Sequence, residues 1–169
     1  MRPILPILAL ALATLLAAVP AAAVSPASTD FVTKASLIGL FEIEASQLAL
    51  QRSQDPAVRA FAQKTVDDMT KSQVALQTAV NSAAGAPQPA AMLDAARQAD
   101  MDALTNATPG GFDHLYTELE VHAHEDAAHL YADYARSGDD TALHAYAADA
   151  LPAVQDHLAQ VETLAGRKP

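Results

Sequence analysis

The sequence contains no cysteine and no tryptophan among its 169 residues. Without cysteine the chain cannot form a disulfide, a thiolate metal site, a cysteine nucleophile or a lipid anchor on a cysteine. Aromatic residues make up only 5% of the chain, and runs of β-branched residues are scarce, which argues against a β-sheet. The abundance of alanine makes helix the expected secondary structure.

Basic residues are also scarce. Ten Lys and Arg against 20 Asp and Glu give a formal net charge of −10, whereas a basic patch is the usual mark of a nucleic-acid partner. We therefore expect no nucleic-acid binding. The serines lie in no G-x-S-x-G elbow or recognisable triad, and no glycine-rich phosphate loop occurs. The sequence thus predicts a protein that is not an enzyme and needs no organic cofactor.

One long apolar run begins the chain. Residues 4–19 are apolar, and Ala21-Ala22-Ala23 has the small-residue pattern of a cleavage site. Pro6 and Pro20 interrupt the run, which is short for a membrane span. We predict a signal peptide over residues 1–23 that is cleaved at its end, with no stable membrane insertion afterwards. The expected location is the periplasm, and the outer membrane and the medium are the alternatives that such a leader allows.

Apolar residues recur at spacings of three and four along four long segments, the pattern of amphipathic helices. The predicted helices span residues 31–52, 56–84, 109–136 and 140–164, with a shorter helix over 90–104. Short connections join the first two and the last two long segments. The predicted fold is all-α: an antiparallel four-helix bundle with a short extra helix between the second and third long helices.

Capping residues define the predicted boundaries: one of Ser28, Thr29 and Asp30 before the first helix, Asp55 before the second, Thr108 before the third, and Asp139 or Asp140 before the fourth. Residues 24–29 are then a flexible lead-in, 30–165 form one helical domain, and 166–169 are a tail.

The stretch ELEVHAHEDAAHLY, residues 118–131, holds three of the six histidines. A helix turns 100° per residue, so this stretch divides into two faces. A lateral stripe is predicted to be a solvated face, and it comprises Glu118, His122, Glu125 and His129. Glu120 and His124 instead share the apolar sector. Because an unpaired buried carboxylate is costly, Glu120 should be protonated, hydrogen-bonded or bound to a cation.

Glu44 and His157 are two further polar residues beside apolar positions. Glu44 lies among the leucines of the first helix, and His157 lies at the edge of an apolar seam on the last. Taken alone, each is a boundary residue with a hydrogen-bonded tip. If they meet Glu120 and His124 across the helices, the four side chains are candidate ligands for zinc, copper or iron.

Four segments, in this order and spacing, carry a resemblance to a known family: FVTKASLIGLFEIEASQLAL, VRAFAQKTVDDMTKSQ, FDHLYTELEVHAHEDAAHLY and LPAVQDHLAQVETL. The chain resembles a bacterial family of exported, ferritin-like helical bundles that is known only as a domain of unknown function. The resemblance covers about residues 30–165. It implies a ferritin-like fold and export, and it brings no established reaction.

The resemblance also bears on the candidate ligands. Family members usually carry a glutamate matching Glu44 and histidines matching His124 and His157. Met69 stands where the family usually has a histidine, and Glu120 stands where it tends to have an apolar residue. A di-iron centre of the ferritin type would need Glu-x-x-His on two helices, whereas this chain has Glu-x-x-x-His on the third long helix. A single ion is therefore the metal site that the sequence allows.

Two functions follow from these observations. The first is a non-enzymatic structural or interaction protein of the cell envelope, with a second copy or an envelope protein as partner. The alternative is a metal-binding protein with one transition-metal site in the bundle core. The sequence favours the first, because a stable helical domain with polar boundary residues accounts for every pattern above.

Overall fold

The computed structural model describes residues 24–166, and within that range it contains five helices and no strand. The predicted all-α class is confirmed. The helices are α1 (Pro26–Arg52), α2 (Pro56–Ser82), α3 (Ala95–Asn106), α4 (Phe112–Ser137) and α5 (Thr141–Leu164). The predicted signal peptide lies outside the described residues. No helix in the described range combines the length and hydropathy that crossing a membrane requires.

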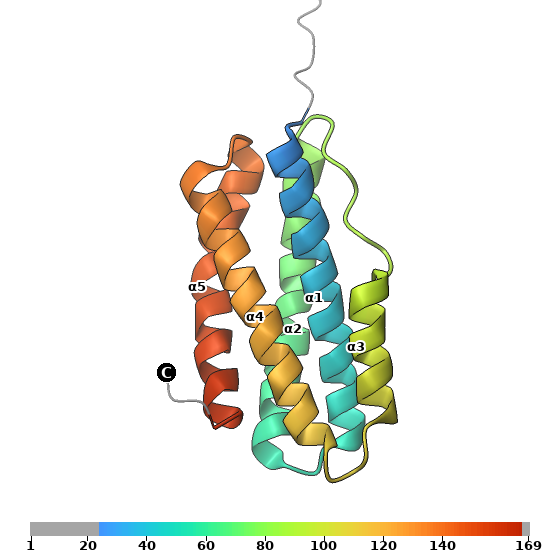
Figure 1. Cartoon of the computed structure of the whole chain (residues 1–169). Coiled ribbons are helices and arrows are strands. Elements are labelled where there is room, and N and C mark those ends of the chain that lie inside the picture. Colours follow the sequence, from blue (N-terminus) through green and yellow to red (C-terminus); the bar gives the residue numbers. More distant parts are fainter. Residues whose placement is uncertain (1–23, 167–169) are drawn as a thin grey trace, which may run out of the picture.

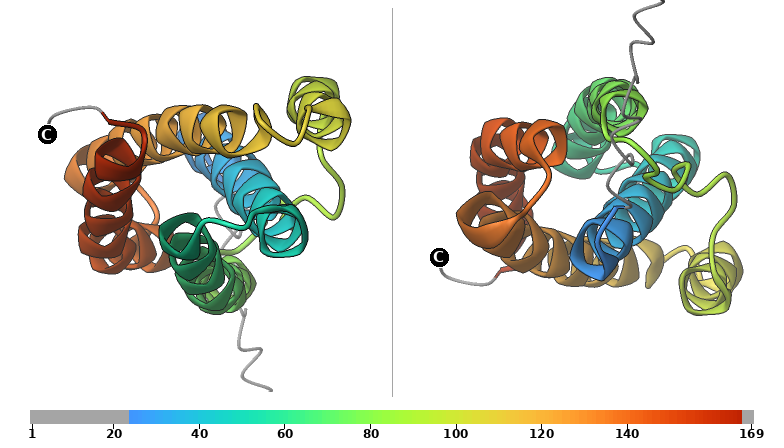
Figure 2. Two further views of the ribbon diagram at one scale, coloured as in Figure 1. Left: turned by 90° about the horizontal axis from the view of Figure 1, so that it is seen from below. Right: turned by 90° about the horizontal axis from the view of Figure 1, so that it is seen from above.

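The four long helices lie side by side, and each runs antiparallel to the long helices that it contacts (Figure 1). α1 packs against α2 and α4, and α5 packs against the same two helices. Seen along the long axis (Figure 2), these four helices surround a common centre, and α3 lies outside it against α1 and α4. The interior is therefore lined by one face of each long helix.

Side-chain caps start most of the helices. Asp55 and Asp140 accept the first free N–H groups of α2 and α5, as predicted. The expected cap of α1 is wrong: Ser25 accepts the Ser28 N–H at 3.0 Å, and Pro26 fits the first helical position, where no N–H is needed. Most of the expected lead-in, from residue 26 on, is thus helix.

Two other predicted starts are also wrong. α3 begins at Ala95, because Asp94 supplies its cap, and not near residue 90. α4 begins at Phe112 without a side-chain cap, after Gly110 and Gly111, and not at Thr108-Pro109. Local capping patterns therefore identified the helices better than they identified their first residues.

Small and aromatic side chains dominate the core. On α1 the buried seam contains Ala35, Ala45, Ala49 and Ser46, and their small size lets neighbouring helices approach closely. Aromatic rings fill the wider spaces, among them Phe31, Phe41, Phe61, Phe112, Tyr116, Tyr131 and Tyr134. The leucines at positions 37, 40 and 48 lie on the flanks of α1 and are only partly buried.

Gly138, between α4 and α5, is a position where the packing excludes a side chain. Its N–H donates to the Tyr134 carbonyl at 2.7 Å, and a methyl group there would clash with the edge of the Tyr134 ring and lie 2.6 Å from the Tyr134 carbonyl oxygen. That ring stacks on Phe31 with 4.1 Å between centroids, so it has little freedom to move.

We expect Gly138→Ala to lower the free energy of unfolding by about 1–3 kcal/mol, the usual cost of overpacking. Gly110→Ala is the matched control, because a methyl group there meets no atom within 4 Å. Urea unfolding of both variants and the parent protein measures the effect. Equal stability of the two variants would show that Tyr134 yields without cost.

Candidate metal centre

Four ionisable side chains are buried in the interior of the helices. Glu42 lies on α1, Glu120 and His124 on α4, and His157 on α5. Their exposed fractions are 1%, 0%, 1% and 0%, so water does not solvate them. Burying so many polar groups is costly unless each one finds a partner.

His124 lies between the two glutamates. Its Nδ1–H donates to the backbone carbonyl of Glu120 at 2.8 Å, because a carbonyl oxygen can only accept. The same nitrogen is 3.4 Å from Glu120 Oε2 and 3.6 Å from Glu42 Oε1. With the proton on Nδ1, the lone pair of neutral His124 is on Nε2.

His157 extends from α5 toward His124. Its ring centroid is 5.5 Å from that of His124, and the Phe61 ring lies 6.0 Å from each imidazole. The Nε2 atom of His157 accepts a hydrogen bond from the Lys64 ammonium at 2.7 Å, since an ammonium group is only a donor. This bond leaves the ring proton of His157 on Nδ1.

Each of these four side chains has one buried polar atom without a hydrogen-bond partner: Glu42 Oε1, Glu120 Oε2, His124 Nε2 and His157 Nδ1. Folded proteins satisfy nearly all buried polar atoms, so each exception needs a cause. Four exceptions in contacting side chains indicate a shared cause, such as a bound cation or protons shared among the groups.

Burial sets the protonation of the carboxyl groups. It raises the pKa of Glu42, although the nearby His124 and Arg97 side chains oppose the rise. Burial raises the pKa of Glu120 well above its usual range, and the negative charge of Glu42 adds to the effect. Two adjacent carboxyl groups in a dry site cannot both ionise without a nearby cation.

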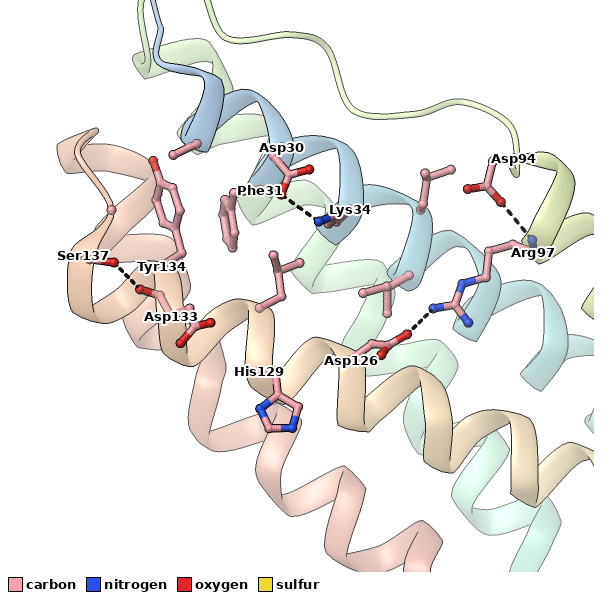
Figure 3. A pocket seen from close by; sticks show the side chains of 15 residues that line it. Asp30, Phe31, Lys34, Asp94, Arg97, Asp126, His129, Asp133, Tyr134 and Ser137 are labelled. Carbon is pink, nitrogen blue, oxygen red and sulfur yellow. Dashed lines mark hydrogen bonds and ion pairs between the residues drawn. The ribbon is translucent and has the colours of Figure 1, made fainter.

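Arg97 of α3 supplies one positive charge from outside the ring of long helices. Its side chain is 15% exposed and bonds to Asp126 at 3.1 Å, and its guanidinium lies 5.2 Å from the centroid of Phe41, the residue before Glu42. Figure 3 shows Arg97 extending from α3 toward Asp126 across a groove between α1, α3 and α4. α3 thus contributes charge to a centre that it does not enter.

The other oxygen of Glu120 has a partner. Ser46 Oγ lies 3.5 Å from Glu120 Oε1 and 2.9 Å from the Tyr116 hydroxyl. Both contacts are buried, so Ser46 holds one side of this carboxyl group in place. Only Oε2 of Glu120 is left to face His124.

The carboxylate of the first helix that lies beside His124 is Glu42, two residues before the predicted Glu44. Glu44 is only partly buried, on the flank with the leucines, whereas Glu42 is fully buried. Glu42 follows Ala35 by seven residues and precedes Ala45 and Ala49 by three and seven, so it lies in the small-residue seam of α1. The leucines indicated the flank of α1, whereas the buried residues near Glu42 along the helix include Gly39, Phe41, Ala45 and Ser46.

The prediction for the inward pair of the histidine-rich stretch holds, because Glu120 and His124 are buried. The predicted solvated stripe holds in part: His122 and His129 are exposed, whereas Glu118 and Glu125 are half-buried. His129 lies on the rim of the groove in Figure 3. Met69, the residue at the family's usual histidine position, is buried and lines a separate groove between α2 and α5.

The residues present suit a transition metal in chemical type. Carboxylate oxygens and imidazole nitrogens are ligands that zinc, copper(II) and iron(II) accept. In residues 24–166, however, no three His, Asp or Glu side chains are drawn together closely enough to hold an ion. Metal binding at this centre therefore requires rotation of side chains, and the centre is not a preformed cage.

The raised pKa of Glu120 predicts how stability changes with pH in metal-free protein. When a carboxyl group is protonated in the folded protein but ionised in the unfolded chain, the free energy of unfolding falls as pH rises above the pKa of the unfolded state. The fall is about 1.4 kcal/mol per pH unit. We expect Glu120→Gln to remove part of this loss, so that the variant gains stability relative to the parent between pH 5 and pH 7. Urea unfolding with chelator measures it, and Glu44→Gln is the control. A parallel pH profile for Glu120→Gln and the parent would contradict a buried, protonated Glu120.

Comparison with known proteins shows the fold and the family. The structure is similar to a crystal structure of a DUF305 fragment from Deinococcus radiodurans, with a TM-score of 0.71 and 14% identity, over 87% of this chain and 100% of that one. It is also similar to CopM in its Cu(II)-bound form, with a TM-score of 0.69 and 17% identity, over 82% of this chain and 95% of that one. The Ag-bound form of CopM gives 0.65 and 18%, over 80% and 93%.

At these identities the likeness shows a shared fold. No protein with a curated description matches the chain. The model of DUF4142, a domain of unknown function, matches residues 13–164. The chain therefore belongs to the DUF4142 family.

Proposed function

We propose that this protein is an exported, non-enzymatic helical-bundle protein of the cell envelope that holds one transition-metal ion in its core. The ligands are drawn from Glu42, Glu120, His124 and His157. The observation that carries the proposal is the set of four buried polar atoms without hydrogen-bond partners. A cation satisfies two carboxylate oxygens and the lone pair of His124 Nε2 together, and it also satisfies His157 Nδ1 once that nitrogen has given up its proton.

The orientation of His124 supports this reading. A metal-ligating histidine usually donates its second ring N–H to a carbonyl or carboxylate, which fixes the tautomer and the ring. His124 makes that bond from Nδ1 to the Glu120 carbonyl and keeps a buried lone pair on Nε2. Neutral imidazole with a fixed tautomer is ready to bind a metal.

Protons are the competing explanation for the same atoms. The Nδ1–H of His157 is a donor and Nε2 of His124 is an acceptor, so a small movement would join them. The pKa values of Glu42 and Glu120 are both raised, so protons can likewise keep these two carboxyl groups neutral. In that state the centre is structural and the protein is an interaction or scaffold protein. A metal would displace these protons on binding.

The fold adds support of a general kind. We infer that the helices form a ferritin-like, antiparallel four-helix bundle, an architecture that builds metal sites from side chains on facing helices. CopM, a structural neighbour, binds copper and silver in its solved structures. A helical domain of this shape is thus able to hold a metal ion.

Burial supports a non-enzymatic role. The four side chains are no more than 1% exposed, so a small ion can reach them more easily than an organic substrate. The apolar residues 1–23 support export. We infer that the mature protein acts in the periplasm, where an ion-binding bundle can store or sequester a metal.

The proposal predicts a metal-dependent rise in melting temperature of the tag-free protein. A ligand at 100 times its dissociation constant adds about 2.7 kcal/mol, or roughly 5–10 °C for a domain of this size. Zinc, copper and iron salts are compared in thermal melts, with a chelator as reference, and metal content is measured on the protein as purified. We expect at least one of the three ions to bind at one equivalent.

Variants locate the site. Glu42→Gln and His124→Gln should abolish the shift, and Glu44→Gln and His129→Gln, which change exposed or flanking residues of the same helices, should keep it. Unchanged melting with all three ions would refute the metal function and favour the structural one. Loss of the shift in all four variants would place the bound ion on the surface.

A further inference from the structure

The outward side of His157 forms a second polar cluster, distinct from the buried centre. Lys64 Nζ lies 2.7 Å from His157 Nε2, 3.1 Å from Asp68 Oδ2 and 3.4 Å from Asp156 Oδ2. α2 contributes Lys64 and Asp68, and α5 contributes Asp156 and His157. One ammonium group is therefore surrounded by an imidazole nitrogen and two carboxylate oxygens.

The cluster reaches from the core to solvent. His157 is 0% exposed, whereas the side chains of Lys64, Asp68 and Asp156 are 39%, 32% and 61% exposed. Lysine is held on four flexible bonds, so Lys64 can swing into water without moving the backbone. Its departure would leave two carboxylates and the lone pair of a buried imidazole facing one another.

These donors are the kind that a divalent transition metal takes. A mixed set of one imidazole nitrogen and two carboxylate oxygens suits zinc or copper(II). His157 Nε2 and Asp68 Oδ2 are already 3.2 Å apart, a separation close to that between two ligands on one ion with bonds of about 2.1 Å. Asp156, the most exposed member, must rotate to complete the set.

The charges favour a cation here. Each oxygen of Asp68 faces an ammonium group: Lys64 Nζ lies 3.1 Å from Oδ2, and Lys71 Nζ lies 3.1 Å from Oδ1. His157 Nε2 accepts from the Lys64 ammonium, so its lone pair points to the same position. Neutral imidazole and ionised carboxylate are the forms that bind metals.

We propose that Asp68, Asp156 and His157 form a second, outer site for a divalent transition-metal ion, and that the Lys64 ammonium occupies it as a built-in competitor. A metal ion binds there by displacing Lys64 into solvent. The outer site does not require a metal ion in the buried centre, since the two sites share only His157 and use different nitrogens of its ring. If both sites exist, His157 links them, with Nε2 facing outward and Nδ1 unpartnered in the interior.

Removing the competing charge tests the proposal. We expect Lys64→Gln to strengthen Zn²⁺ binding at this site by about tenfold or more, because it removes the ammonium group whose attraction to the two carboxylates the metal ion must otherwise overcome. Isothermal titration of the tag-free protein with zinc chloride measures the affinity and the stoichiometry. Nitrogen NMR of the histidine rings should show a Zn²⁺-induced change at His157 Nε2 in Lys64→Gln.

Lys71→Gln is the matched control. It removes the same charge from the same helix, and Lys71 bonds to Asp68 Oδ1 at 3.1 Å but is 76% exposed and lies on the other oxygen. Its gain in affinity should be well below that of Lys64→Gln. Adding Asp156→Asn to Lys64→Gln should reverse the gain through the lost ligand and not through the fold, because the Asp156 side chain is 61% exposed.

The outcomes separate this inference from the proposed function. The double variant Lys64→Gln/Glu42→Gln is compared with Lys64→Gln. If the double variant binds one Zn²⁺ equivalent fewer and keeps the tenfold gain in affinity, both sites are supported. If Lys64→Gln binds a single Zn²⁺ equivalent and the double variant binds it with the same gain, the outer site alone is supported. Equal Zn²⁺ affinity of Lys64→Gln, Lys71→Gln and the parent would overturn the outer site. An unchanged His157 ring signal would overturn it as well.

Discussion

The cost of placing Glu42, Glu120, His124 and His157 out of reach of water governs the interior of this protein. Four ionisable groups in contact with one another are far more demanding than an apolar core of the same volume, since each charge must be neutralised or matched. The surrounding residues meet part of that demand. Ser46 bonds one glutamate oxygen, the Glu120 carbonyl accepts from His124, and Lys64 bonds His157. What they leave unmet is one polar atom on each of the four side chains.

α3 contributes to the buried centre through charge more than through packing. It contributes one fully buried residue, Leu104, to the described core, so its packing alone adds little. Arg52 of α1 ties down its end by donating to the carbonyls of Leu104 and Ala107 at 2.6 Å. Arg97 then lies near enough to lower the pKa of both buried glutamates against the larger effect of burial. The short helix therefore acts mainly as a carrier of positive charge for a carboxylate pair that the long helices enclose.

His157 connects two regions that differ in solvation. One ring nitrogen meets a lysine and an aspartate at the surface, and the other is enclosed without a partner. The ring lies beside Phe61, which also contacts His124 and separates both imidazoles from solvent on the α2 side. A charge or an ion arriving at the surface cluster is thus one imidazole away from the buried carboxylates. This arrangement is why the two proposed sites share one residue.

The metal-free protein and a metal-bound form would differ in protons as well as in side-chain positions. The described donors are spread too widely to hold an ion. Because the pKa values of the two buried glutamates are raised, protons neutralise in the metal-free protein the carboxyl groups that a cation would neutralise in the bound form. Exchange between protons and a metal makes affinity depend on pH. Such a centre would release its ion more readily than a rigid cage of ligands already in place.

The sequence by itself determined the helical class, the approximate spans of the long helices, and the division of residues 118–131 into a solvated stripe and an inward pair. Those features depend on local spacing, because the 100° turn per residue decides which side chains share a face of a helix. Only the tertiary structure decided that Glu42, and not Glu44, faces the centre, that His157 is fully buried, and that Arg97 approaches from α3. The spacing of residues along a helix shows which of them share a face, but not which face the neighbouring helices cover. On α1 the neighbouring helices cover the face that carries Ala45, Ser46 and Ala49, and they leave the leucines on the flank.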